Sequence, residues 1–251
     1  MRAIGRRQVS LFKSLVRTTG FALPVAAALA GQAAADDKIG SAAHAQNSVE
    51  RLLKTMTTPI KLGDDVFSNE KVRTGVDSSA RFVFTDTTNL AMGPTSTVTL
   101  DRFVYSGETN YAKAAVKFTT GAFRFTTGVS DKNAYQIKTD TATIGVRGTV
   151  FDVRVDRGVT TVTLVEGAIA ICPRSRFDGD PRKLSKAQLK AYHCQELTMA
   201  GQTARVTSRT ASLSSTPFSF AANFCSSGGL CDVTTTVASN GQGGLMCYIK
   251  Q

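Results

Sequence analysis

The sequence of 251 residues contains no tryptophan and only two histidines, His44 and His193. Catalysis by a Ser-His-Asp or Cys-His group needs a histidine as the base, and both histidines lie outside the β-rich middle of the chain. His193 precedes Cys194 directly, but adjacent side chains usually point apart and a disulfide would remove the thiol. The paired carboxylates Asp64 and Asp65 lie in a turn-like stretch. We therefore predict a protein without catalytic residues and without a cofactor.

Long apolar runs are also missing. No segment after residue 35 reaches the roughly 20 apolar residues that a transmembrane helix needs. The first 17 residues hold five basic residues and no acidic ones, residues 20–30 are apolar, and Ala33–Ala35 precede Asp36. This order is typical of a signal peptide cleaved after Ala35. We expect export to the periplasm or the medium, and Arg6-Arg7 leaves both the general secretory and the twin-arginine route open.

The chain has five cysteines but no C-x-x-C motif, which argues against a zinc site, and we predict no metal. After export, disulfides are expected. Cys172 ends an apolar strand pattern and Cys194 opens the next one, so a bond between them would close the long insert 173–193. The remaining three cysteines leave Cys225–Cys231 and Cys231–Cys247 open as a second bond.

Basic residues outnumber acidic ones by 11, and the insert concentrates part of this excess. The candidates for binding a polyanion are Arg182, Lys183, Lys186 and Lys190. An exported protein rarely meets nucleic acid, so we expect no nucleic-acid partner and consider anionic polysaccharide or lipid head groups instead. A solvated helix face explains the same charges. Asp180 and Pro181 favour the start of such a helix, over residues 182–192.

Short apolar-alternating segments with turn signals every 8–12 residues indicate an all-β protein. The predicted strands include residues 80–84, 90–92, 98–100, 114–118 and 122–126. Val49, Leu52, Leu53 and Met56 have helical spacing, which predicts a short helix within residues 36–58.

Residues 139–171 combine two glycine-containing turns with alternating strands. Gly145 and Gly148 flank Arg147, whose guanidinium we expect to bond turn carbonyls or a carboxylate. A second reversal is predicted at Glu166-Gly167. The ordered set of positions is Gly145, Val146, Arg147, Gly148, Thr149, Phe151, Glu166 and Gly167.

These positions resemble the signature of FecR-type domains. Upstream positions match the same family pattern in order: Gly63, Asp64, Val66, Thr74, Gly75, Ala80, Phe82, Phe84, Asp86, Met92, Gly93, Pro94, Ser96 and Val98. The glycine that usually follows the aspartate is Thr87 here, so we expect another turn geometry. The resemblance implies a compact, twisted two-sheet fold, with sandwich and short solenoid-like packing both open.

The resemblance also implies periplasmic sensing, signalling or scaffolding through contacts with envelope or secreted proteins. The best-known FecR-type regulators add a cytoplasmic anti-sigma segment and a membrane span, and we expect neither here. Binding of anionic envelope or extracellular polysaccharide by the basic insert is the alternative. The expected organisation is a signal peptide (1–35), an N-terminal segment (36–58), a FecR-like domain (59–172), a basic helical insert with a returning strand (173–208) and a disulfide-pinned C-terminal extension (209–251).

Overall fold

The structure is a computed structural model that describes residues 37–53 and 56–224. The predicted signal peptide and Cys225, Cys231 and Cys247 lie outside these residues. Two units are distinguished, Met1–Ala35 and Asp36–Gln251, and all described residues belong to the second. None of the helices in the described part is long and apolar enough to cross a membrane.

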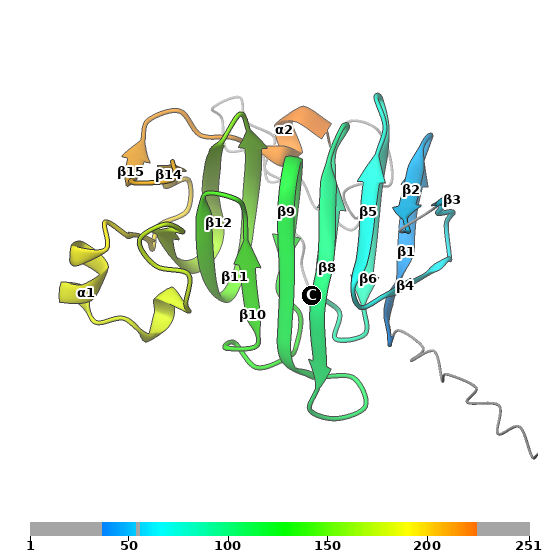
Figure 1. Cartoon of the computed structure of the whole chain (residues 1–251), viewed down its shortest axis with the longest axis horizontal. Helices are drawn as coiled ribbons and strands as arrows, with labels where there is room; N and C mark the ends of the chain where they lie inside the picture. Colours follow the sequence, from blue (N-terminus) through cyan, green and yellow to red (C-terminus); the bar gives the residue numbers. More distant parts are fainter. Residues whose placement is uncertain (1–36, 54–55, 225–251) are drawn as a thin grey trace, which may run out of the picture. The chain divides into compact units, whose positions relative to one another are not determined.

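The described residues form a mostly β fold whose 15 strands share one hydrogen-bonded network (Figure 1). Strands β9 and β10 run parallel, and the other paired strands run antiparallel. The network is arranged as two layers. The first layer contains β3 (Thr57–Pro59), β2 (Val49–Leu52), β5 (Glu70–Thr74), β8 (Thr97–Tyr105), β10 (Tyr135–Lys138) and β13 (Gln195–Leu197). The second contains β4 (Asp65–Phe67), β1 (Lys38–Gln46), β6 (Ser79–Phe84), β7 (Asn89–Met92), β14 (Thr203–Val206) and β15 (Ala211–Ser214).

Three long strands belong to both layers: β9 (Tyr111–Thr126), β11 (Ala142–Asp156) and β12 (Val159–Pro173). The first part of β9 pairs with β8 and β10, whereas residues 121–126 pair with β7 and β11. Each strand changes partners near a glycine with positive φ, namely Gly121 (φ 107°), Gly148 (φ 61°) and Gly167 (φ 89°). Such bends let a strand pass from one packed sheet to the other.

The core lies between the two layers and consists of the apolar side of each strand. Phe82, Phe123, Phe125 and Phe151 have no exposed surface, and the rings of Phe125 and Phe151 lie 5.6 Å apart. The alternation of apolar and polar residues predicted these inward positions because successive side chains of a strand point to opposite faces. The predicted all-β, two-sheet class is confirmed.

The helix expected within residues 36–58 is wrong, because β1, β2 and the start of β3 occupy this range. Of the four apolar residues at helical spacing, Val49 is buried but Leu53 and Met56 are exposed. Strand β1 pairs with β4 and β6, and β2 pairs with β3 and β5. Long-range pairing in the sheet therefore overrides the local pattern.

Three predicted reversals are bends inside long strands. The segments expected as separate strands at 114–118 and 122–126 form the single strand β9, and β12 continues through Glu166-Gly167. The expected turn at residues 145–149 is likewise part of β11. Glycine in these places serves a bend of the strand rather than the end of one.

The insert contains two short helical elements instead of one helix over residues 182–192. Asp180 caps the 3-10 turn η1 (Pro181–Lys183), and extended backbone at Leu184 interrupts the helix. Helix α1 (Lys186–Ala191) then begins with a capping box between Ser185 and Gln188. The described part of the C-terminal extension contributes β15 and a short helix, α2 (Phe220–Phe224).

Candidate functional site

The paired bends of β11 and β12 explain two glycines of the 145–167 motif. The register between these strands shifts between Arg147 and Val150. A Cβ atom on Gly167 would lie 2.2 Å from the carbonyl oxygen of Gly148, and both glycines have positive φ. No larger residue fits at Gly167 without moving the backbone. The motif therefore fixes the place where two strands turn together from one layer to the other.

Gly145 is needed for a different reason, because the side chain of Arg182 lies against it. A Cβ atom on Gly145 would be 2.7 Å from Cγ of Arg182. The Arg182 guanidinium donates to the carbonyl oxygens of Val146 (2.7 Å), Lys132 (2.5 Å) and Asn133 (3.0 Å). It also forms a two-pronged ion pair with Asp180, with both N–H···O distances at 2.8 Å. Arg182 thus fastens the insert to β11 and to the loop before β10.

Arg147 does not make the contacts expected of it. Its side chain is exposed, and it forms no hydrogen bond or ion pair with any residue between 37 and 224 that the structure describes. Glu166, on the neighbouring strand, is also exposed. The structural arginine of this region is Arg182, which sequence reasoning had assigned to a binding surface. The sequence carries no local signal that Arg182 rather than Arg147 makes the structural contacts, because the two arginines are 35 positions apart.

The other motif residues belong to the interior. Val146 and Phe151 are completely buried and Thr149 is 2% exposed. The backbone N–H of Thr149 donates to Oγ1 of Thr127 at 2.8 Å, which ties the bend of β11 to the end of β9. These residues hold the corner of the fold together and are not free to meet a ligand.

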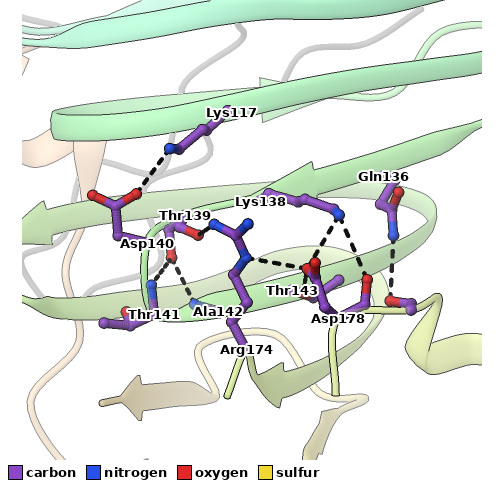
Figure 2. Close-up of polar contacts among 11 residues, drawn as sticks. Lys117, Gln136, Lys138, Thr139, Asp140, Thr141, Ala142, Thr143, Arg174 and Asp178 are labelled. Carbon is purple, nitrogen blue, oxygen red and sulfur yellow. Dashed lines mark hydrogen bonds and ion pairs between the residues drawn. The ribbon is translucent and has the colours of Figure 1, made fainter. Parts of the chain in front are cut away.

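Asp178 provides a second attachment of the insert (Figure 2). Its Oδ1 accepts from Nζ of Lys138 and from Nε of Arg174, both at 3.1 Å, and from Oγ1 of Thr143 at 3.3 Å. Beside it, Gln136 donates to the carbonyl oxygen of Gly179 at 3.2 Å. The insert is therefore held along β10 and the first part of β11.

Both acidic residues of the insert have altered acidity. Burial acts to raise the pKa of Asp178, but the hydrogen bond and charge of Lys138, with Arg174 and Thr143, hold that pKa below its usual value. Burial likewise acts to raise the pKa of Asp180, and the hydrogen bonds and charge of Arg182 lower it more strongly. Each carboxylate is thus kept ionised by the cations that it binds.

The predicted disulfide between Cys172 and Cys194 is present and closes the base of the insert. Both cysteines are buried next to Leu189 of α1, and the rings of Phe177 and Tyr192 pack against the same cluster. The ring centroids of Phe177 and Tyr192 are 5.3 Å apart. A small apolar core of its own thus supports the insert.

The four predicted polyanion-binding residues do not share one role. The Arg182 side chain is only 11% exposed and its donors are occupied. Lys183, Lys186 and Lys190 are exposed. Within the described ranges no group of three or more His, Cys, Asp or Glu residues is placed to hold a metal ion.

Sequence reasoning missed a buried ion pair on the sheet. Nε and Nη2 of Arg124 donate to the two carboxylate oxygens of Asp152 at 2.7 and 2.9 Å, and the Asp152 side chain is 1% exposed. The backbone N–H of Phe220 donates to the same carboxylate at 2.8 Å. A buried charge pair thereby anchors α2 to β11. Its only trace in the sequence is a charged residue in each of two apolar strand patterns.

Comparison with known proteins identifies this architecture. The family model described as FecR protein matches residues 70–170, from the start of β5 to near the end of β12. Residues 70–170 therefore match the FecR family. The bends at Gly148 and Gly167 both lie inside the matched region, whereas Arg182 and the disulfide partner Cys194 lie beyond it.

Two crystal structures of a candidate anti-sigma factor from Parabacteroides distasonis, at 2.50 and 1.65 Å resolution, are similar to the chain. Both alignments have 12% sequence identity, with TM-scores of 0.40 and 0.39. Each spans 57% of this chain and 57% of the solved one. No curated protein sequence matches the chain.

One departure from the FecR pattern, Thr87 in place of the usual glycine, lies at a turn with positive φ. Thr87 has φ 67°, the left-handed conformation that a glycine adopts easily. Asp86 supports this turn, because its carboxylate accepts from the backbone N–H of Thr88 at 3.0 Å and from the hydroxyl of Tyr135. Thr87 thus adopts a conformation that favours glycine, at a cost in backbone strain.

Proposed function

We propose that this protein is an exported, non-enzymatic FecR-domain module that acts in envelope signalling or scaffolding by binding another protein. The match to the FecR family supports the signalling role. The signal-peptide pattern of residues 1–35 supports export. If it is exported as proposed, N-terminal sequencing of the mature protein will find Asp36 first, whereas recovery of the chain with Met1 would contradict this part of the proposal.

The observation that carries the proposal is the exposure of the two charged residues of the motif. Arg147 and Glu166 are exposed at the paired bends, and neither forms an ion pair with a described residue. In the β11–β12 ladder Arg147 pairs with Ala168 and Glu166 pairs with Val150, on the two sides of the register shift. The fold accounts for the glycines and apolar residues of the motif but gives these two charges no internal partner. Neighbouring charges of opposite sign suit a protein surface of complementary charge.

A site-specific crosslink tests this surface. A photo-crosslinking amino acid replaces Arg147 in one protein and Arg157 in the control, since Arg157 is 93% exposed in the turn of the same hairpin. We expect a product of defined mass with an envelope protein from position 147 and none from position 157.

A charge reversal completes the experiment. Glu166→Lys should abolish the crosslink from position 147 while leaving thermal unfolding unchanged. Arg147→Ala should alter the free energy of unfolding by less than about 0.5 kcal/mol, because the side chain is exposed and unpaired. Identical products from positions 147 and 157, or a large loss of stability in Arg147→Ala, would count against a recognition surface at the bends.

A further inference from the structure

A cleft of about 560 Å³ lies where β8, β9 and β10 meet the insert. Its volume is within the range of small-molecule binding sites. The cleft lining contains none of the residues of the motif at 145–167. Its lining includes five cationic side chains and two carboxylates, so positive charge prevails.

Small side chains make this region hollow. Ala114 and Ala115 of β9 and Ala134 before β10 line the cleft. The three residues are neighbours across the parallel β9–β10 pair, where Ala114 and Ala115 face Tyr135 and Gln136 in the register. Larger residues at these positions would fill the space. The hollow therefore follows from the sequence of β9 as well as from the position of the insert.

A bulge in β8 directs an arginine to the same place. The register of β8 on β9 shifts between Leu100 and Arg102. Leu100 and Phe103 are buried, whereas Asp101 and Arg102 are both exposed and both line the cleft. A regular strand would send these two adjacent side chains to opposite faces, and bulges are known to re-aim side chains in this way.

The cations of the cleft fall into two groups. Arg182 is neutralised by Asp180, and Lys138 is bound to Asp178 at 3.1 Å. Arg102, Lys113 and Lys183 form no ion pair with the described residues. These three come from β8, from β9 and from η1, and Arg182 fixes the wall that carries Lys183. Three cations that form no close ion pair with a described residue thus line one open cleft, together with the carboxylate of Asp101.

We propose that this cleft binds a multivalent oxyanion through Arg102, Lys113 and Lys183. The ligand class is a molecule or a polymer terminus of small-molecule size with closely spaced carboxylates or phosphates. Charged hydrogen bonds from arginine and lysine suit such groups. The amide of Asn133 borders the cleft and can serve adjacent hydroxyl or carbonyl groups. This ligand site is separate from the protein contact proposed at the bends, and either can exist without the other.

Titration calorimetry with two probes tests the proposal on the mature protein with its disulfide intact. Tripolyphosphate tests for a ligand with phosphate groups, and trigalacturonate tests for a ligand with carboxylate groups. At 50 mM NaCl at least one probe is expected to bind with a Kd below about 1 mM, and binding should weaken at least about tenfold at 500 mM NaCl because screening shortens the reach of the charges. The probe that binds shows whether the cleft takes phosphate or carboxylate groups.

Three variants locate the site. The cleft variant is Arg102→Gln/Lys113→Gln/Lys183→Gln, and its Kd should rise at least about tenfold, since several charged hydrogen bonds are lost. The control Lys186→Gln/Lys190→Gln/Arg209→Gln removes the same charge from exposed residues outside the cleft lining and should change the Kd less than about twofold. Ala115→Leu fills the cleft without changing charge and should also abolish binding. If Ala115→Leu does not fold, Lys113→Gln alone replaces it, with an expected rise in Kd of a few fold.

The proposal fails if neither probe binds the wild-type protein at 50 mM NaCl. It fails equally if the control variant loses as much affinity as the cleft variant, because binding then follows net charge. Full affinity in a folded Ala115→Leu protein would place the ligand elsewhere.

Discussion

Replacement of Arg182 by alanine should destabilise the attachment of the insert, although the sequence places this residue in a solvated basic stretch. The side chain bonds three backbone carbonyls and both oxygens of Asp180. Arg182→Ala removes this donor from the three carbonyls and leaves Asp180, whose side chain is 17% exposed, without its ion-pair partner. The loss of one partner of a largely desolvated pair is more damaging than the loss of both.

The expected loss is about 3 kcal/mol in the free energy of unfolding, the lower end of the cost of breaking a buried pair, because both side chains keep some contact with water. For a protein of this size each kcal/mol lowers Tm by roughly 2–4 °C, so Tm should fall by about 6–12 °C. Urea and thermal unfolding measure both values. Hydrogen exchange over residues 174–193 shows whether the insert opens before the sheets unfold.

Lys183→Ala is the matched control, because the neighbouring side chain is exposed and makes no ion pair with the described residues. Its stability should lie within about 0.5 kcal/mol of the wild type. Equal stability of Arg182→Ala and Lys183→Ala, with unchanged exchange in the insert, would refute the structural role of Arg182.

Three further perturbations have defined outcomes. Thr87→Gly should raise the free energy of unfolding by about 1 kcal/mol in urea titrations, because glycine removes the strain of a left-handed β-branched residue, and a decrease would contradict this. The lowered pKa of Asp180 means that its ionisation stabilises the fold above its ordinary value of 3.8 and that this contribution is lost as the pH falls through the lowered value. The difference in Tm between wild type and Asp180→Asn should therefore shrink on acidification below about pH 4, and a constant difference would exclude the linkage. Loss of the bond that joins Cys172 and Cys194, 22 residues apart, should cost about 3 kcal/mol by the chain-entropy model, and reducing agent should lower the Tm of the wild type more than that of the Cys172→Ser/Cys194→Ser protein.

The strands could be predicted because apolar alternation is a local signal. The disulfide could be predicted because only cysteines can form it and their positions in the sequence are known. Alternation at Phe82 and Phe84 shows which side of β6 is buried, since the two side chains share one face of a strand. The pairing of Cys172 with Cys194 followed from the strand patterns on both sides of the insert. The FecR motif likewise identified the domain, because several positions had to match in order.

The bends could not be recognised in the same way. A glycine beside polar residues is compatible with a reversal and with a bend, and the difference depends on whether the strand keeps its partner. At Gly167 the deciding contact is with the carbonyl oxygen of Gly148, 19 residues earlier in the chain. Local propensity has no information about that contact, and the same applies to the N-terminal segment that joins the sheets instead of forming a helix.

The sequence alone determined the fold class, the FecR domain and the Cys172–Cys194 bond, because apolar alternation, motif order and cysteine placement are properties of the chain itself. Only the tertiary structure decided the roles of the arginines. Arg147 remains exposed while Arg182 binds backbone carbonyls of Val146 and Asn133. A guanidinium becomes structural where folding brings unpaired acceptors within hydrogen-bond distance, and those acceptors belong to segments remote from it in the chain.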